Sequence, residues 1–290
     1  MGAHLCTSTG VEEGQFNQGV EELGSKNIRL SEAAKQILGD EVMQQPPTPS
    51  QEVLDSFQPI YFDNGGVYQG EWRDNMLRHG YGVQTTQDGA KHEGFWKDDK
   101  ADGWGRKTFP EGDIYEGMWK AGKANGQGVF WYVNGTMYRG AFQNDVPHGI
   151  GVEVWPDGSS FAGTFVQGKK SGKGKLQLSD CSVFEGDFQN NDINGFGKYI
   201  WADGKCYEGY FKQNKMHGKG TMVWPDNAKY MGDFRDDQKH GYGLYSWPDG
   251  RKYEGEWSEG KQSGEGIYTN QLGEVKKGIY SAGKLVNWIE

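Results

Sequence analysis

Histidines at a regular spacing are the residues of this chain that come closest to a metal-binding pattern. Four of them stand directly before a Gly-x-Gly step, at intervals of 23 residues or a multiple of 23: His79, His148, His217 and His240. Imidazoles are zinc ligands, but groups a full repeat or more apart do not converge easily on one ion. The spacing therefore favours structural or turn-facing histidines, and the sequence predicts no metal site.

The other chemical patterns are weaker. The Gly-x-Gly steps resemble fragments of a phosphate-binding loop, but no helix pattern follows them, and such a loop needs a helix N-terminus. Cys181 and Cys206 lack the spacing of a metal or redox motif and are expected to be free thiols. No Ser-His-Asp or Cys-His arrangement can be argued. We therefore expect no catalytic residues, no cofactor and no enzyme activity.

Lysines form the densest basic cluster of the chain over seven residues, at Lys169, Lys170, Lys173 and Lys175. Such a cluster is compatible with a local contact to an anion or a phosphoinositide headgroup. The sequence favours the ordinary interpretation, that these lysines lie on solvated strand edges and turns. Both interpretations stay open at the level of sequence.

The elements that would carry these residues are set by a repeat. The pattern aromatic-x-Gly-x-aromatic recurs every 23 residues, and a copy centred on Gly70 lies 24 residues before the first regular one. The regular centres are Gly94, Gly117, Gly140, Gly163, Gly186, Gly209, Gly232, Gly255 and Gly278. A fixed period of this length indicates a repeat array. Such arrays make long surfaces and seldom build a catalytic pocket.

Each unit reads as a β-hairpin. Its first turn has Gly, Asn or Asp at one position in ten copies: Asn75, Asp99, Gly122, Asp145, Gly168, Asn191, Asn214, Asp237, Gly260 and Gly283. These residues tolerate a positive φ angle, so we expect a short turn with one left-handed residue. Its second turn reads Pro-Asp-Gly in full copies such as 248–250, with proline at the first corner and glycine at the left-handed one. The units then form one antiparallel meander.

Aromatic residues, 14% of the chain, follow the same period. We expect a structural ladder stacked along one face of the sheet: Trp72, Trp96, Trp119, Phe142, Phe165, Phe188, Phe211, Phe234, Trp257 and Tyr280. A second ladder on that face would be Phe109, Tyr132, Trp155, Leu178, Trp201, Trp224 and Trp247. Rings that cover the strand glycines keep the backbone dry, so the ladders are predicted to form the core.

This unit closely resembles the MORN repeat. Tyr-x-Gly-x-Trp at 253–257 and His-Gly-x-Gly at 240–243 are the clearest matches, and the resemblance covers about three quarters of the chain. Departures are local: His92 and Lys276 replace the first aromatic residue of a unit, and Cys181 and Asn227 replace a turn glycine. The resemblance implies an all-β, elongated, single-layer antiparallel meander of stacked hairpins.

Two regions follow from these patterns. Residues 61–290 are expected to form the array, with nine complete units and a partial tenth that ends about Tyr280. Residues 1–60 lack the repeat and are expected to be mostly disordered with short helices. One of these is an amphipathic helix from Ser31 to about Met43, in which Ala34, Ile37 and Leu38 share a face. We expect this helix to dock on the array or on a partner.

Charge and cysteine usage limit the classes of partner and the cellular compartment that are expected. The net charge is −9, and residues 1–60 hold three basic and nine acidic side chains, which leaves −3 for the array. No basic field invites nucleic acid. Three scattered cysteines and no secretory signal favour a cytoplasmic setting. At the N-terminus, Gly2 and Cys6 are lipidation candidates, for myristoylation and a second acyl chain, although Cys6 stands where Ser or Thr is preferred.

The function expected is a non-enzymatic scaffold or adaptor. It would hold a protein partner, as a helix or an extended segment, in the groove of an aromatic-lined sheet. The resemblance implies a link between cytoskeleton or axoneme and membrane, as in a radial-spoke head protein, with a location at the cytoskeleton, the cilium or a membrane face. The alternative is a peripheral membrane protein that binds phosphoinositide or phosphatidic acid. MORN arrays are also found fused to kinase or methyltransferase domains, but the chain has no room for one.

Overall fold

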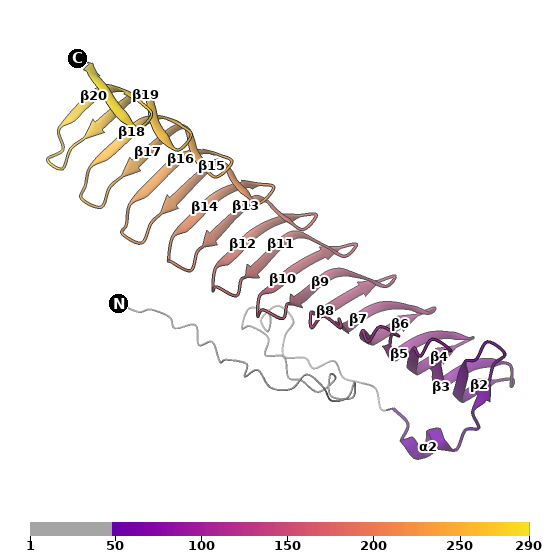
Figure 1. Ribbon diagram of the computed structural model, residues 1–290. Helices are drawn as coiled ribbons and strands as arrows, with labels where there is room; N and C mark the ends of the chain where they lie inside the picture. Colours follow the sequence, from indigo (N-terminus) through magenta and orange to yellow (C-terminus); the bar gives the residue numbers. More distant parts are fainter. Residues whose placement is uncertain (1–47, 290) are drawn as a thin grey trace. The chain divides into compact units, whose positions relative to one another are not determined.

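The computed structural model describes residues 48–289, which form two compact units divided between Ala162 and Gly163 (Figure 1). From residue 48 on, the first unit has one short helix followed by strands. Its elements are α2 (Gln51–Asp55), β1 (Ile60–Tyr61), β2 (Val67–Arg73), β3 (Leu77–Thr85), β4 (Lys91–Lys97), β5 (Lys100–Thr108), β6 (Ile114–Lys120), β7 (Lys123–Trp131), β8 (Met137–Gln143) and β9 (Val146–Val154). Strand β10 (Ser160–Val166) contains the division between the units.

The second unit contains strands only, and each of them pairs antiparallel with the next. They are β11 (Lys169–Gln177), β12 (Val183–Gln189), β13 (Asp192–Ile200), β14 (Cys206–Lys212), β15 (Lys215–Val223), β16 (Lys229–Arg235), β17 (Gln238–Ser246), β18 (Lys252–Ser258), β19 (Lys261–Thr269), β20 (Val275–Ser281) and β21 (Lys284–Ile289). The antiparallel meander predicted from the repeat is thus confirmed. No described helix is long and apolar enough to cross a bilayer.

The first turn of each hairpin differs from its prediction in one respect. All ten predicted residues have a positive φ angle, but so does the residue before each of them. In the turn that joins β14 to β15, Gln213 has a φ of 49° and Asn214 a φ of 66°. Two left-handed residues in a two-residue loop make a type I′ turn, whose twist matches that of the flanking strands. The expectation of one left-handed residue was therefore wrong.

An asparagine or aspartate at the second turn position also joins neighbouring hairpins. The Asn214 backbone N–H donates to the Ile193 carbonyl at 2.9 Å, and the Asn214 Oδ1 accepts from the Ile193 N–H at 2.7 Å. Asp237 makes the same pair of bonds with Met216. Glycine copies such as Gly260 provide only the backbone bond. The side-chain carbonyl explains why Asn and Asp recur where conformation alone would favour glycine.

The core consists of aromatic rings packed edge to face on one side of the sheet, which we call the front face. Within each unit, the first aromatic ring of one repeat contacts the second aromatic ring of its own and of the next repeat. The centroids are 4.8–5.6 Å apart and the ring planes 78–89° apart. The rings therefore alternate in orientation, and the expected stacking is replaced by a zigzag that favours edge-to-face contact.

Burial shows which rings carry the core. Of the predicted ladder, Trp72 is half-buried, and the other members are buried. The deepest residues, however, are the first aromatics of the repeats, which the predicted ladder omitted: Tyr68, Tyr115, Tyr138, Phe161, Phe184, Tyr207, Tyr230 and Tyr253. Each tyrosine hydroxyl among them donates to the carbonyl three residues later, as Tyr207 does to Tyr210 at 2.9 Å. This bond satisfies the polar atom inside the core.

Residues 1–47 lie outside the described part of the chain. The lipidation candidates Gly2 and Cys6 and the predicted helix from Ser31 to Met43 fall there. The described helix α2 lies at Gln51–Asp55, where its buried Leu54 contributes to the packing of the first unit.

Candidate functional site

The second predicted ladder lies at the open side of the front face and is not part of the buried core. In the second unit, its tryptophans join half-buried tyrosines in what we call the open aromatic row: Tyr199, Trp201, Trp224, Tyr245, Trp247, Tyr268 and Trp288. Neighbouring rings contact each other from Trp224 to Trp288, with centroids 4.8–6.4 Å apart. A separate pair, Tyr199 and Trp201, lies 4.4 Å apart. From Trp224 to Trp288 the row offers a continuous, partly exposed apolar surface.

A cation lies over every indole of the open aromatic row. The Nζ of Lys205 lies 4.3 Å from the Trp201 ring, and the Nζ of Lys276 lies 5.6 Å from the Trp288 ring. The Arg251 guanidinium lies 5.3 Å from the Trp247 ring. Cations over ring faces are held by the ring quadrupole. The surface is therefore apolar and positively charged at once.

Lys239 is the most enclosed of these cations. Its Nζ lies 4.2 Å from the centroid of Trp257, 4.6 Å from Tyr245, 5.6 Å from Tyr230 and 5.8 Å from Trp224. Burial among these rings lowers the pKa of Lys239 to about 8. At the same position the two preceding repeats carry Met216 and Ile193. An ammonium group has thus replaced an apolar side chain.

The replacement Lys239→Met should stabilise the protein by about 1–2 kcal/mol at pH 7, after allowance for the partial exposure of the amine. Because the folded-state pKa lies below the ordinary 10.5, the unfolded chain binds the extra proton between pH 8 and pH 10.5. The destabilisation caused by Lys239 should therefore decrease across that window, and the advantage of the methionine variant should shrink there. Urea titrations of both proteins at pH 7, 9 and 10.5 measure this difference. A difference that is constant with pH would contradict the enclosed ammonium.

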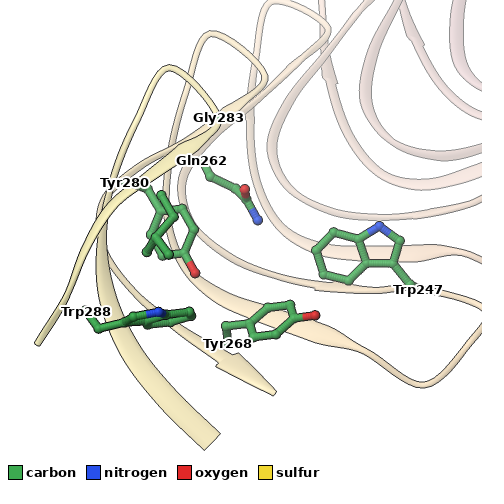
Figure 2. A pocket seen from close by; sticks show the side chains of 7 residues that line it. Trp247, Gln262, Tyr268, Tyr280, Gly283 and Trp288 are labelled. Atoms are coloured by element: carbon green, nitrogen blue, oxygen red, sulfur yellow. The ribbon is translucent and has the colours of Figure 1, made fainter. Parts of the chain in front are cut away.

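A pocket ends the open aromatic row at the last strands (Figure 2). It has a volume of about 280 Å³ and is lined by Trp247, Gln262, Tyr268, Tyr280, Gly283, Leu285 and Trp288. In Figure 2 the Trp288, Tyr268 and Tyr280 rings gather at one side, and Trp247 lies across from them. Aromatic walls around a small volume suit an inserted apolar side chain or proline ring.

Two of these lining residues belong to a strand that the sequence analysis missed. The array was expected to end about Tyr280, but β21 continues to Ile289 and carries Leu285 and Trp288. Gly278 would otherwise lack its covering ring, because Lys276 replaces the aromatic residue of that repeat. A Cβ placed on Gly278 would lie 2.7 Å from Leu285 Cδ1 and 3.1 Å from Trp288 Cε3. An uncovered strand glycine, followed by a Gly turn and a short segment rich in apolar residues, is the signal that predicts this strand.

The predicted lysine cluster is divided in the structure. Lys173 Nζ pairs with Asp187 Oδ1 at 2.7 Å, whereas Lys170 Nζ lies 5.9 Å from the Phe165 ring. Lys169 is exposed, and Lys175 is half-buried opposite Glu185. The four ammonium groups are therefore not collected at one site.

The histidines and cysteines stay apart as well. His79 Nδ1 lies 3.3 Å from Asp98 Oδ1, and His217 Nδ1 lies 3.7 Å from Asp236 Oδ1, so both face the turn of the following hairpin. Cys181 is exposed, and Cys206 is a half-buried free thiol. Within residues 48–289, no three His, Cys, Asp or Glu side chains are placed to hold a metal ion.

Comparison with solved structures finds folds with low similarity. The TCP10 domain of Danio rerio CPAP in complex with a peptide of Danio rerio STIL has a TM-score of 0.43 and 14% identity, and covers 81% of this chain and 99% of that one. The SAS-4 (dCPAP) TCP domain in complex with a proline-rich motif of Ana2 of Drosophila melanogaster has a TM-score of 0.35 and 15% identity. This match covers 67% of the present chain and 99% of the TCP domain chain. These scores are too low to indicate a shared function.

Comparison with curated proteins finds no match. The family profile described as MORN repeat, in contrast, matches nine consecutive segments: residues 68–91, 92–114, 115–137, 138–160, 161–180, 184–206, 207–229, 230–250 and 253–270. These segments cover more than half of the chain and coincide with the observed hairpins. The chain belongs to the MORN repeat family.

Proposed function

We propose that this protein is a non-enzymatic scaffold that holds a protein partner along the open aromatic row of its second unit. The observation that carries this proposal is the continuous run of half-buried and exposed rings from Trp224 to Trp288, which ends in a pocket. Exposed contiguous apolar surfaces mark interaction sites, and aromatic residues dominate the energetics of protein interfaces.

The charges define the chemistry of the partner. Because a cation lies over each indole, a segment that alternates apolar residues with Asp or Glu is the best complement. Its apolar residues would cover the rings, and one would enter the pocket beside Trp247. Its carboxylates would pair with Lys239 and Lys276. Binding should therefore weaken as the salt concentration rises.

Quantitative affinity capture from the native cell tests the site with matched variants. Trp247→Ala removes a ring of the pocket. Tyr242→Ala removes an equally aromatic side chain, 52% exposed, from the opposite face of β17. Proteins retained by wild type and Tyr242→Ala should be lost with Trp247→Ala. Peptides of such a protein should then bind Trp247→Ala at least tenfold more weakly, as expected for an interface hot spot. Identical partner sets for all three proteins would contradict the proposed surface.

We further propose that the scaffold connects a cytoskeletal or ciliary partner with a membrane, and that the membrane is reached through the N-terminus. The pairing of Lys173 with Asp187 supports this division of roles, because it reduces the positive charge that the array offers to anionic lipid.

Membrane attachment should accordingly depend on Gly2. A Gly2→Ala variant is expected to move from the membrane fraction to the soluble fraction, because one or two acyl chains supply the binding energy. The variant Lys169→Glu with Lys170→Glu should stay with the membrane. Fractionation of cells that express each full-length variant measures this. If the lysine variant is released and the Gly2 variant is not, the array itself binds the lipid headgroups.

A further inference from the structure

The back face of the first unit carries a covered apolar patch, although Met118 and Ile150 on the same face are 40% and 49% exposed. The back face is the side of the sheet opposite the aromatic core. In the first unit it carries buried apolar residues with exposed fractions of 0–8%: Trp104, Ile114, Val129, Met137, Val152 and Ala162. Their register makes them one patch, since Val129 and Val152 both pair with Arg139, and Ile114 and Met137 both pair with Trp131.

The same repeat positions are open in the second unit. Phe196 and Tyr242 correspond to Trp104 and are 43% and 52% exposed. Ile267 corresponds to Val152 and is 37% exposed, and Val275 corresponds to Met137 and is 63% exposed. A single-layer sheet leaves its back face open to water, as the second unit shows. The patch of the first unit therefore has a covering segment.

The start of the described chain lies on this same face. The Gln69 Nε2 donates to the Leu54 and Phe57 carbonyls at 3.0 and 3.1 Å, and this holds α2 on the back face of β2. Thr48, the first described residue, is hydrogen-bonded through its side chain to the hydroxyl of Tyr81 on β3. The described chain thus begins on the back face at β3, two strands before Trp104, the first residue of the patch, on β5. A tethered segment there has a high effective concentration.

We propose that the segment from Ser31 to Met43 is an amphipathic helix that covers the back face of the first unit. Leu30, Ala34, Ile37, Leu38 and Val42 fall on one face at helical spacing. A helix of this length is about 20 Å long. The extended residues 44–47 add about 13 Å. Together they reach from β3 to β9, about 29 Å away at the usual strand spacing. The proposal adds a second, intramolecular surface to that of the open aromatic row.

The test uses the full-length chain with two charge-matched double variants. Ile37→Glu with Leu38→Glu places two carboxylates on the apolar face of the helix. Gln36→Glu with Met43→Glu places two on its opposite face. Neither pair belongs to a strand of the array, so the strands should remain folded, as circular dichroism would verify. Binding of the apolar dye ANS and tryptic cleavage after Arg29 report whether the segment covers the patch.

The Ile37 and Leu38 variant should bind several-fold more dye than wild type and be cleaved after Arg29 at least tenfold faster, because undocked segments are cleaved readily. The Gln36 and Met43 variant should match wild type. Wild-type rates in both variants would overturn the proposal. Light scattering provides a second test. A dimer that Met137→Glu dissociates, but that the Ile37 and Leu38 variant leaves intact, would overturn the proposal, because a second copy of the chain would then cover the patch.

Discussion

Removal of the Tyr207 ring is expected to reduce the free energy of unfolding by about 3–5 kcal/mol, the usual cost of truncating a buried aromatic side chain. Tyr207 is fully buried, and its ring centroid lies 5.0 Å from that of Phe211 and 4.9 Å from that of Phe234. Urea unfolding of Tyr207→Ala measures the loss. Trp201→Ala should cost less, because Trp201 is half-buried, and the exposed turn variant Gln213→Ala should stay within about 0.5 kcal/mol.

A double-mutant cycle tests why Tyr207 is needed. A Cβ on Gly220 would lie 2.4 Å from the Tyr207 hydroxyl oxygen and 2.5 Å from its ring, so Gly220→Ala forces the two side chains apart. In the Tyr207→Ala background this clash is absent, and Gly220→Ala should become nearly neutral. We expect a coupling free energy of about 1–3 kcal/mol between the two sites. Additive effects would show that glycine is required there for another reason.

The pairing of rings with glycines, and the turns, could be predicted because each depends on local chemistry. Only Gly, Asn or Asp sits comfortably where Asn214 and Gly260 have positive φ angles, so residue type reveals conformation there. Likewise, a strand glycine at a fixed distance from an aromatic residue leaves room for its ring. The additional left-handed residue, such as Gln213, could not be read in this way, because glutamine carries no preference for that conformation.

Which aromatic row is buried could not be predicted from alternation alone. Tyr207 and Trp224 recur with the same period and point to the same face. They differ in their place along the strand: Tyr207 lies over Gly209 of its own strand and Gly220 of the next, whereas Trp224 follows the end of β15, at the turn. The position of the open aromatic row is therefore set by where the strands end. Its cations come from residues that differ from one repeat to the next, such as Lys239.

Acid should destabilise the first unit through His92. This residue replaces the first aromatic of its repeat, and its ring centroid lies 4.9 Å from that of Trp96 and 4.8 Å from that of Trp119. Within residues 48–289, no hydrogen-bond partner faces its buried Nε2. Burial, with Lys107 and Arg78 adding like charge, lowers the pKa of His92 to about 3. The core therefore holds a neutral imidazole that the unfolded chain would protonate below about pH 6.5.

The sign of the effect follows from linkage. Between pH 6.5 and pH 3 His92 is protonated in the unfolded chain but not in the folded protein. Its contribution to the free energy of unfolding therefore falls as the pH falls, by up to about 4–5 kcal/mol. His92→Tyr should remove this component and gain a hydroxyl able to donate to the Phe95 carbonyl, as Tyr115 does to Met118 at 2.9 Å. Because carboxylates also titrate in this range, the measured quantity is the difference in unfolding free energy between wild type and His92→Tyr at pH 7, 5 and 4. Tyr115→His, which places an imidazole in the next repeat, should show the same loss relative to wild type. If the difference does not change with pH, the pKa of His92 is the same in the folded and the unfolded chain. The buried imidazole would then not make the core sensitive to acid.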